Sequence, residues 1–105
     1  MEQKHRTILR HHWFNIRQNL EPKNVLPKLV IVLIETDEQE IKAQPTVHDR
    51  CDKLLEILPR RGPNAFKVFV DALKEEAPFL ASDLIESGNK EERNQSSALM
   101  YWSIN

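Results

Sequence analysis

The chain has 105 residues, of which 15 are basic, 16 are acidic and only two are glycine. This length suits one domain, and the near-zero net charge provides no bulk attraction to nucleic acid or to an anionic membrane. A single cysteine excludes an internal disulfide and a metal site built from several thiolates. The polar N-terminus and a longest apolar run of six residues predict neither a secretory signal nor a membrane span. We therefore expect a cytoplasmic protein.

The composition favours an all-helical domain, because glycine is scarce while Leu, Ile, Lys and Glu are abundant. Apolar residues at helical spacing predict a first helix from Lys4 to Leu20. Asn24 suits the start of a second helix that continues to Ile34 and, being apolar nearly all round, lies at the centre of the bundle. On its own this run is also compatible with a buried strand, but no other segment offers a partner strand.

The next signals predict a short third helix. Thr36 and Gln39 have the spacing of a capping box, in which each side chain satisfies a free amide at the start of a helix. We expect this helix to continue through Gln44 and to turn Ile41 and Ala43 inward.

Residues 53–73, KLLEILPRRGPNAFKVFVDAL, predict two amphipathic helices joined by a tightly specified turn. Thr46 caps the first of these helices, and Pro59 distorts its last turn. Gly62 supplies a left-handed helix stop, and Pro63 has no amide to lose at a helix start. Neither helix can bury its apolar stripe alone, so the rest of the chain must cover both.

A sixth helix is expected to start near Pro78, to bury Leu84, Ile85 and either Phe79 or Leu80, and to stop at residues 87–89. The domain thus spans residues 1–89. Residues 90–105 are expected to form a loosely ordered tail. Its apolar end, residues 98–105, is compatible with packing on the bundle, with extending the sixth helix, or with an exposed segment.

The sequence offers no catalytic constellation and no cofactor-binding motif. Cys51 and His48 lie three residues apart but lack a third, orienting group, and Cys51 falls on an apolar stripe that predicts a buried thiol. His11 and His12 point about 100° apart on a helix and cannot chelate one metal ion together. We expect a non-catalytic domain with no cofactor and no metal.

The helical hairpin of residues 53–73 carries a more specific signal of family membership. Its sequence resembles the junction of the fourth and fifth helices in caspase recruitment domains, most closely those of initiator caspases and their adaptor proteins. The residues that carry the likeness are Leu54-Leu55, Ile57-Leu58-Pro59, Arg61-Gly62-Pro63, Ala65-Phe66, Phe69 and Ala72-Leu73. The likeness spans roughly Lys4 to Glu86. It implies an antiparallel six-helix bundle of the death fold, and the six helices expected above agree with it.

The resemblance also implies a task and the surfaces that perform it. Such domains dock onto other caspase recruitment domains and bring caspases together in apoptotic or innate-immune signalling, with no chemistry in the domain itself. A basic surface on the first and fourth helices commonly meets an acidic surface on the second and third helices of the partner. The basic residues expected to take part are Lys4, Arg6, Arg10, Arg17, Arg50 and Lys53. The acidic residues are Glu35, Asp37, Glu38 and Glu40, and Arg60 and Arg61 form a second positive spot.

Opposite charges on two sides of one domain predict a head-to-tail contact. Residues 1–20 have a charge balance of +3 and residues 35–40 one of −4, whereas Asp49 and Asp52 dilute the positive charge of the fourth helix. The pattern fits a caspase prodomain, an adaptor or a standalone domain. A standalone domain could act as a decoy that caps assemblies, because the chain ends soon after the domain. A helical nucleic-acid binder is disfavoured by the near-neutral total charge.

Overall fold

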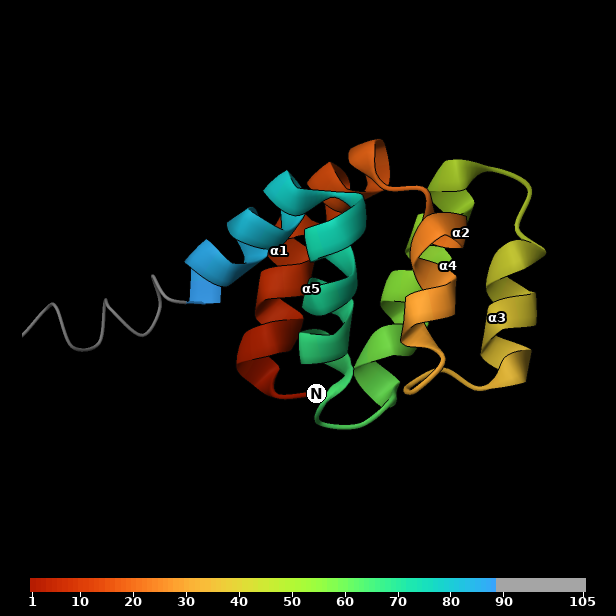
Figure 1. The fold of residues 1–105 in the computed structure, drawn as a ribbon, viewed down its shortest axis with the longest axis horizontal. Helices are drawn as coiled ribbons and strands as arrows, with labels where there is room; N and C mark the ends of the chain where they lie inside the picture. Colours follow the sequence, from red (N-terminus) through yellow and green to blue (C-terminus); the bar gives the residue numbers. More distant parts are fainter. Residues whose placement is uncertain (89–105) are drawn as a thin grey trace, which may run out of the picture.

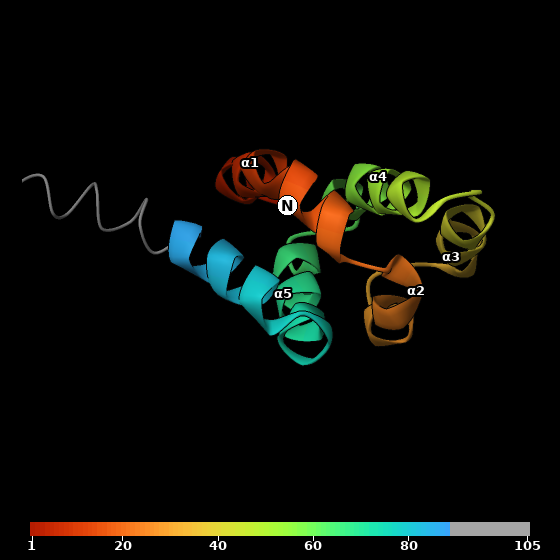
Figure 2. The ribbon, with the colours of Figure 1, turned by 90° about the horizontal axis from the view of Figure 1, so that it is seen from above.

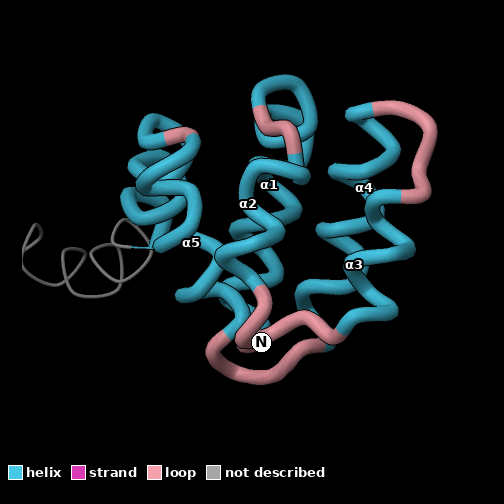
Figure 3. Tube along the Cα trace, turned by 45° about the vertical axis from the view of Figure 1, so that its right-hand side comes forward, coloured by secondary structure: helices cyan, strands magenta, loops and turns pink. Residues whose placement is uncertain are grey.

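The structure is a computed structural model that describes residues 1–88, and this part of the chain is helical with no β-strand (Figure 1, Figure 3). A final helix over residues 78–88 follows the labelled elements. These elements are α1 (Gln3–Asn19), α2 (Pro22–Val25), the 3-10 helix η1 (Leu26–Leu29), α3 (Glu35–Lys42), α4 (Val47–Ile57), the 3-10 helix η2 (Leu58–Arg60) and α5 (Ala65–Glu76). The predicted all-α bundle of six helices is thereby confirmed for residues 1–88.

Helix α4 lies between α1 and α3 and packs against both (Figure 2). Viewed from above, α1 and α4 lie along one side of the bundle, and α5 and α2 lie along the other (Figure 2). The helix over residues 78–88 runs beside α1, where Asn15 donates a hydrogen bond to Asp83. The apolar stripes predicted from the sequence meet in one core. Its fully buried members include Ile8, Ile16, Leu29, Ile41, Leu54, Leu58, Phe69, Leu73 and Leu84.

The predicted second helix is wrong in both its start and its extent. Helix α2 begins at Pro22, where Glu21 accepts a hydrogen bond from the Lys23 amide, and it ends after one turn. Pro27 has no amide hydrogen and its ring disfavours a continuing α-helix, so the chain passes into the 3-10 helix η1. Residues 30–32 then form a turn rather than a helix. The exposed fractions of Val30, Ile31 and Ile34 are 57%, 76% and 57%, so the second half of the apolar run is not central.

The predicted start of the third helix is also corrected. Helix α3 begins at Glu35, and the Ile34 amide donates to the Asp37 carboxylate at 3.2 Å. Asp37 therefore takes the capping role that the sequence assigned to Thr36 and Gln39. The helix ends at Lys42, so Ala43 is exposed rather than turned inward.

The corner between α4 and α5 has the predicted geometry. The Thr46 hydroxyl accepts from the Asp49 amide at 3.0 Å and caps α4, and Pro59 lies in the irregular η2 that follows this helix. Gly62 has a φ of 95°, a left-handed conformation that residues with a Cβ rarely adopt.

The last described helix buries Leu80 and Leu84 but leaves Ile85 exposed. Ile85 follows Leu84 by about 100° around the helix axis, which turns it from the core toward solvent. The expectation that Ile85 is buried is therefore wrong. The predicted stop at residues 87–89 and the tail over residues 90–105 lie, at least in part, outside the described residues.

Substitutions at the two glycines, Gly62 and Gly88, are expected to have opposite effects on stability. Replacing Gly62 with Ala is expected to lower the unfolding free energy by about 1–2 kcal/mol, because the added Cβ disfavours a positive φ although nothing lies within 4 Å of it. Replacing Gly88 with Ala is expected to raise the unfolding free energy by about 0.5–1 kcal/mol, because alanine has the higher helix propensity. The added Cβ would make an ordinary 3.7 Å contact with Ile8. Urea denaturation measures both changes. Equal effects of the two substitutions would contradict the backbone argument.

Candidate interaction surfaces

Two arginine–carboxylate pairs fix the starts of α2 and α3 to α4 and the corner that follows it. Glu21, which caps α2, accepts hydrogen bonds from Arg50 Nε at 3.2 Å and from Arg50 Nη2 at 2.8 Å. Asp37, which caps α3, accepts from Arg61 Nε at 2.6 Å and from Arg61 Nη2 at 2.7 Å. Both arginines use their planar forks on two carboxylate oxygens. We call these contacts the Glu21–Arg50 clamp and the Asp37–Arg61 clamp.

Three residues expected on docking surfaces, Arg50, Asp37 and Arg61, are thus bonded to partners in the same chain. Arg50 is only 9% exposed, and its Nη1 also donates to the Gln44 carbonyl. The Asp37 side chain is 4% exposed beneath the Arg61 side chain. These residues lie where sequence reasoning expected charge, but their side chains are already occupied by partners in the same chain.

The Glu21–Arg50 clamp also ties stability to pH. The hydrogen bonds from Arg50 hold the pKa of Glu21 below its ordinary value, against the opposing effect of desolvation. A lowered carboxyl pKa contributes stability that is present above the unfolded-state pKa and is lost as the pH falls through the folded-state pKa.

The basic residues of α1 divide into paired and exposed ones. Arg17 Nε donates to Asp52 at 3.0 Å, and Trp13 Nε1 donates to the same carboxylate at 2.8 Å, so Arg17 joins α1 to α4. Arg6 is exposed and reaches the Pro59 carbonyl at 3.5 Å. Arg10 is exposed and forms no ion pair with any residue among 1–88. Lys4 is half-buried.

On the acidic side, Glu35 and Glu40 are exposed and Glu38 is half-buried. Lys53 of α4 lies 4.0 Å from Glu40, so positive and negative side chains mingle where α3 packs on α4. Arg60, from the second positive spot, is exposed, whereas its neighbour Arg61 is in the clamp. The exposed charges outside the clamps therefore include those of outer α1 and of α3.

Sequence reasoning missed the exposed apolar residues. Phe14 of α1 is 71% exposed and Ile31 in the turn after η1 is 76% exposed. Phe14 falls outside the stripe formed by Leu9, Trp13 and Ile16, so its position on the helix was a signal that could have identified it. Ile31 could not be found in this way, because it lies in a run that is apolar at almost every position.

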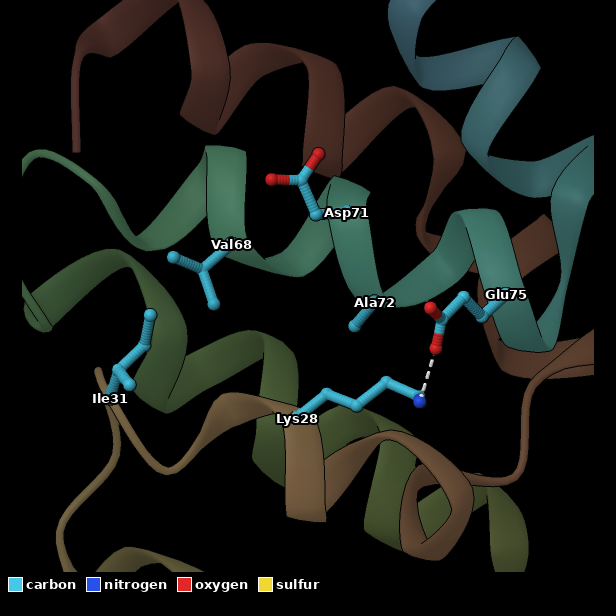
Figure 4. A pocket seen from close by; sticks show the side chains of 6 residues that line it. All are labelled: Lys28, Ile31, Val68, Asp71, Ala72 and Glu75. Atoms are coloured by element: carbon cyan, nitrogen blue, oxygen red, sulfur yellow. Dashed lines mark hydrogen bonds and ion pairs between the residues drawn. The ribbon is translucent and has the colours of Figure 1, made fainter.

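A shallow hollow of about 400 Å³ lies between η1 and α5 (Figure 4). Ile31, Val68 and Ala72 provide its apolar lining. At one end Lys28 forms an ion pair with Glu75, and the Asp71 carboxylate points away from that lysine (Figure 4).

The described residues provide no arrangement for catalysis by a thiol or a metal. Cys51 is fully buried and its thiol donates to the Leu20 carbonyl at 3.1 Å, whereas His48 is exposed. Burial, helped by the nearby Glu21 and Asp52 carboxylates, raises the pKa of Cys51 to about 12. Within residues 1–88 no three His, Cys, Asp or Glu side chains are grouped to hold a metal ion, and no helix is long and apolar enough to cross a membrane.

Residues 6–87 match the family described as the caspase recruitment domain. The match covers most of the chain, and the chain therefore belongs to the caspase recruitment domain family. Domains of this family act through homotypic protein–protein interaction in caspase recruitment and are generally non-catalytic. The helical fold of residues 1–88 agrees with such an interaction module.

The Asp37–Arg61 clamp generates a prediction about stability. Replacing Arg61 with Ala is expected to lower the unfolding free energy by about 2–3 kcal/mol, because it leaves the buried Asp37 carboxylate without its cation. The matched control is Lys74→Ala, which removes an exposed pair with Asp71. It is expected to change the unfolding free energy by less than about 0.5 kcal/mol. Denaturation curves of both variants measure this difference. A change for Arg61→Ala as small as the control would contradict the role of the clamp.

The burial of Cys51 generates a second prediction. In the native protein near pH 8 the thiol is expected to resist an alkylating reagent, because only the thiolate reacts and burial keeps the thiol protonated. Labelling followed by mass spectrometry should accelerate with urea in step with unfolding monitored by circular dichroism. Labelling of the native protein as fast as of the unfolded chain would contradict the buried environment.

Proposed function

We propose that this domain recruits or oligomerises an initiator caspase in apoptotic or innate-immune signalling, through a basic surface on α1 and an acidic surface on α3. The basic surface consists of Lys4, Arg6 and Arg10. The acidic surface consists of Glu35, Glu38 and Glu40. The partner is the caspase recruitment domain of an initiator caspase or of its adaptor, and the site of action is the cytoplasm.

The observation that carries this proposal is the division of charges made by the clamps. Arg50, Asp37 and Arg61 bond inside the domain and need not be desolvated again for docking. Arg10 and Glu35 remain exposed on elements at separate positions in the bundle (Figure 2). Exposed complementary charges accelerate encounter and fix register more than they raise affinity.

Separate surfaces of opposite charge also favour assembly beyond a pair. A domain that offers a basic surface to one neighbour and an acidic surface to another forms a heterologous contact, which propagates unless the rotation closes a ring. A domain that used only one surface would instead cap an assembly, as the decoy alternative requires.

Charge reversal tests the proposal. Arg10→Glu and Glu38→Lys are each expected to weaken binding to the caspase recruitment domain of an initiator caspase or its adaptor by about tenfold or more, mainly through slower association. The salt dependence of the association rate should fall, while the melting temperature stays that of the wild type. Surface plasmon resonance at two salt concentrations measures both effects.

The matched control is Lys67→Glu, which reverses an exposed charge on α5. Binding of this variant should equal that of the wild type. Wild-type association rates for Arg10→Glu and Glu38→Lys, or an equal loss for Lys67→Glu, would contradict the proposed surfaces.

A further inference from the structure

The outer face of α1 combines positive charge with an exposed aromatic side chain. Arg10 and Phe14 are four residues apart, so they lie on the same face, about 6 Å apart along the helix axis. Phe14 is the most exposed aromatic residue among residues 1–88, at 71%. Aromatic residues and arginine are the residue types enriched at the energetic centres of protein interfaces. Nothing in the core or the clamps explains why a phenylalanine stands at this position.

The hollow between η1 and α5 has the complementary character. Its lining is apolar at Ile31, Val68 and Ala72, and it carries the carboxylates of Asp71 and Glu75 at its edges. Around the hollow Lys28 pairs with Glu75 and lies 3.9 Å from Glu76, and Lys74 pairs with Asp71. Three carboxylates thus face two ammonium groups, and one negative charge remains in excess. An aromatic side chain accompanied by a guanidinium therefore fits this hollow both in polarity and in charge.

The hollow also adjoins the acidic surface proposed above. Ile31 precedes Glu35 by four residues, which places their Cα atoms within about 14 Å of each other. A helix that presents Arg10 to Glu35 and Glu38 and runs toward η1 would thus bring its next turn, with Phe14, toward the hollow. The elements lie on opposite sides of the bundle, since α1 is on one side and η1 with α5 is on the other (Figure 2).

We propose that Phe14 of one copy inserts into the hollow between η1 and α5 of a second copy of this chain, as the apolar anchor of the contact between α1 and α3. The inference rests on the proposed function, because it takes the same two charged surfaces to bring the copies together. It adds the group that holds them once they have met. Because the aromatic residue and the hollow lie on opposite sides, each copy can give one contact and receive another, which makes the assembly head-to-tail.

The closing experiment is a complementation of two variants of the full 105-residue chain. Phe14→Ser removes the aromatic anchor but keeps the hollow, and Ile31→Ser removes an apolar wall of the hollow but keeps the anchor. Each variant alone is expected to self-associate about tenfold more weakly than the wild type in sedimentation velocity up to about 1 mM. An equimolar mixture of the two is expected to form dimers, because it still contains one intact anchor and one intact hollow.

Phe79→Ser is the matched control, since Phe79 is 56% exposed on the helix over residues 78–88. Its self-association should equal that of the wild type, and both serine variants should keep the wild-type melting temperature. Failure of the mixture to form dimers, an equal loss for Phe79→Ser, or a wild type that stays monomeric at about 1 mM would each overturn the inference.

Kinetics separate this inference from the proposed function. Phe14→Ser is expected to raise the dissociation rate and to leave the salt dependence of association unchanged, whereas Arg10→Glu and Glu38→Lys act on the association rate. If the charge variants weaken binding and Phe14→Ser does not, the anchor is wrong and the charged surfaces stand. If Phe14→Ser weakens binding and the charge variants do not, the anchor stands and the proposed steering fails.

Discussion

The two clamps are the interactions on which the arrangement of this domain depends. In each, one carboxylate caps the start of a short helix and accepts two hydrogen bonds from the Nε–Nη2 edge of an arginine. Helix α3 has eight residues, packs chiefly on α4 and contributes one apolar side chain, Ile41, to the core. The Asp37–Arg61 clamp supplies orientation that such a short helix cannot obtain from its own propensity. The same bonds determine which surface charges remain for other molecules.

The sequence could predict the parts of the fold that depend on local patterns. The apolar stripes of α1, α4 and α5, the cap at Thr46 and the left-handed Gly62 all follow from residue type and spacing. The second helix could not be predicted in this way, because a run of branched apolar residues looks the same whether it is buried or forms a turn. Pro27 was the deciding residue, and its effect depended on Pro22 starting the helix five positions earlier.

The candidate surfaces were predictable as a set of charges but not as a set of contacts. Arg50 and Arg10 are alike in the sequence, yet the first is closed off by Glu21 and the second is exposed. Asp37 likewise stands among three other acidic residues. Its bond to the Ile34 amide is local, but only the tertiary position of Arg61 places a cation above it. Which charge is internal depends on residues 24 to 29 positions away, and a local pattern carries no such information.

The central claim is that the charges outside the clamps form the docking surfaces, while the clamps stay closed. The most direct measurement is amide NMR on the isotope-labelled domain, titrated with the caspase recruitment domain of an initiator caspase. We expect chemical-shift changes along the outer face of α1 around Arg10 and at the start of α3 around Glu35, with the amides of Arg50 and Cys51 unchanged. Changes that centre on Arg50 and Glu21 and leave outer α1 unaffected would contradict the claim.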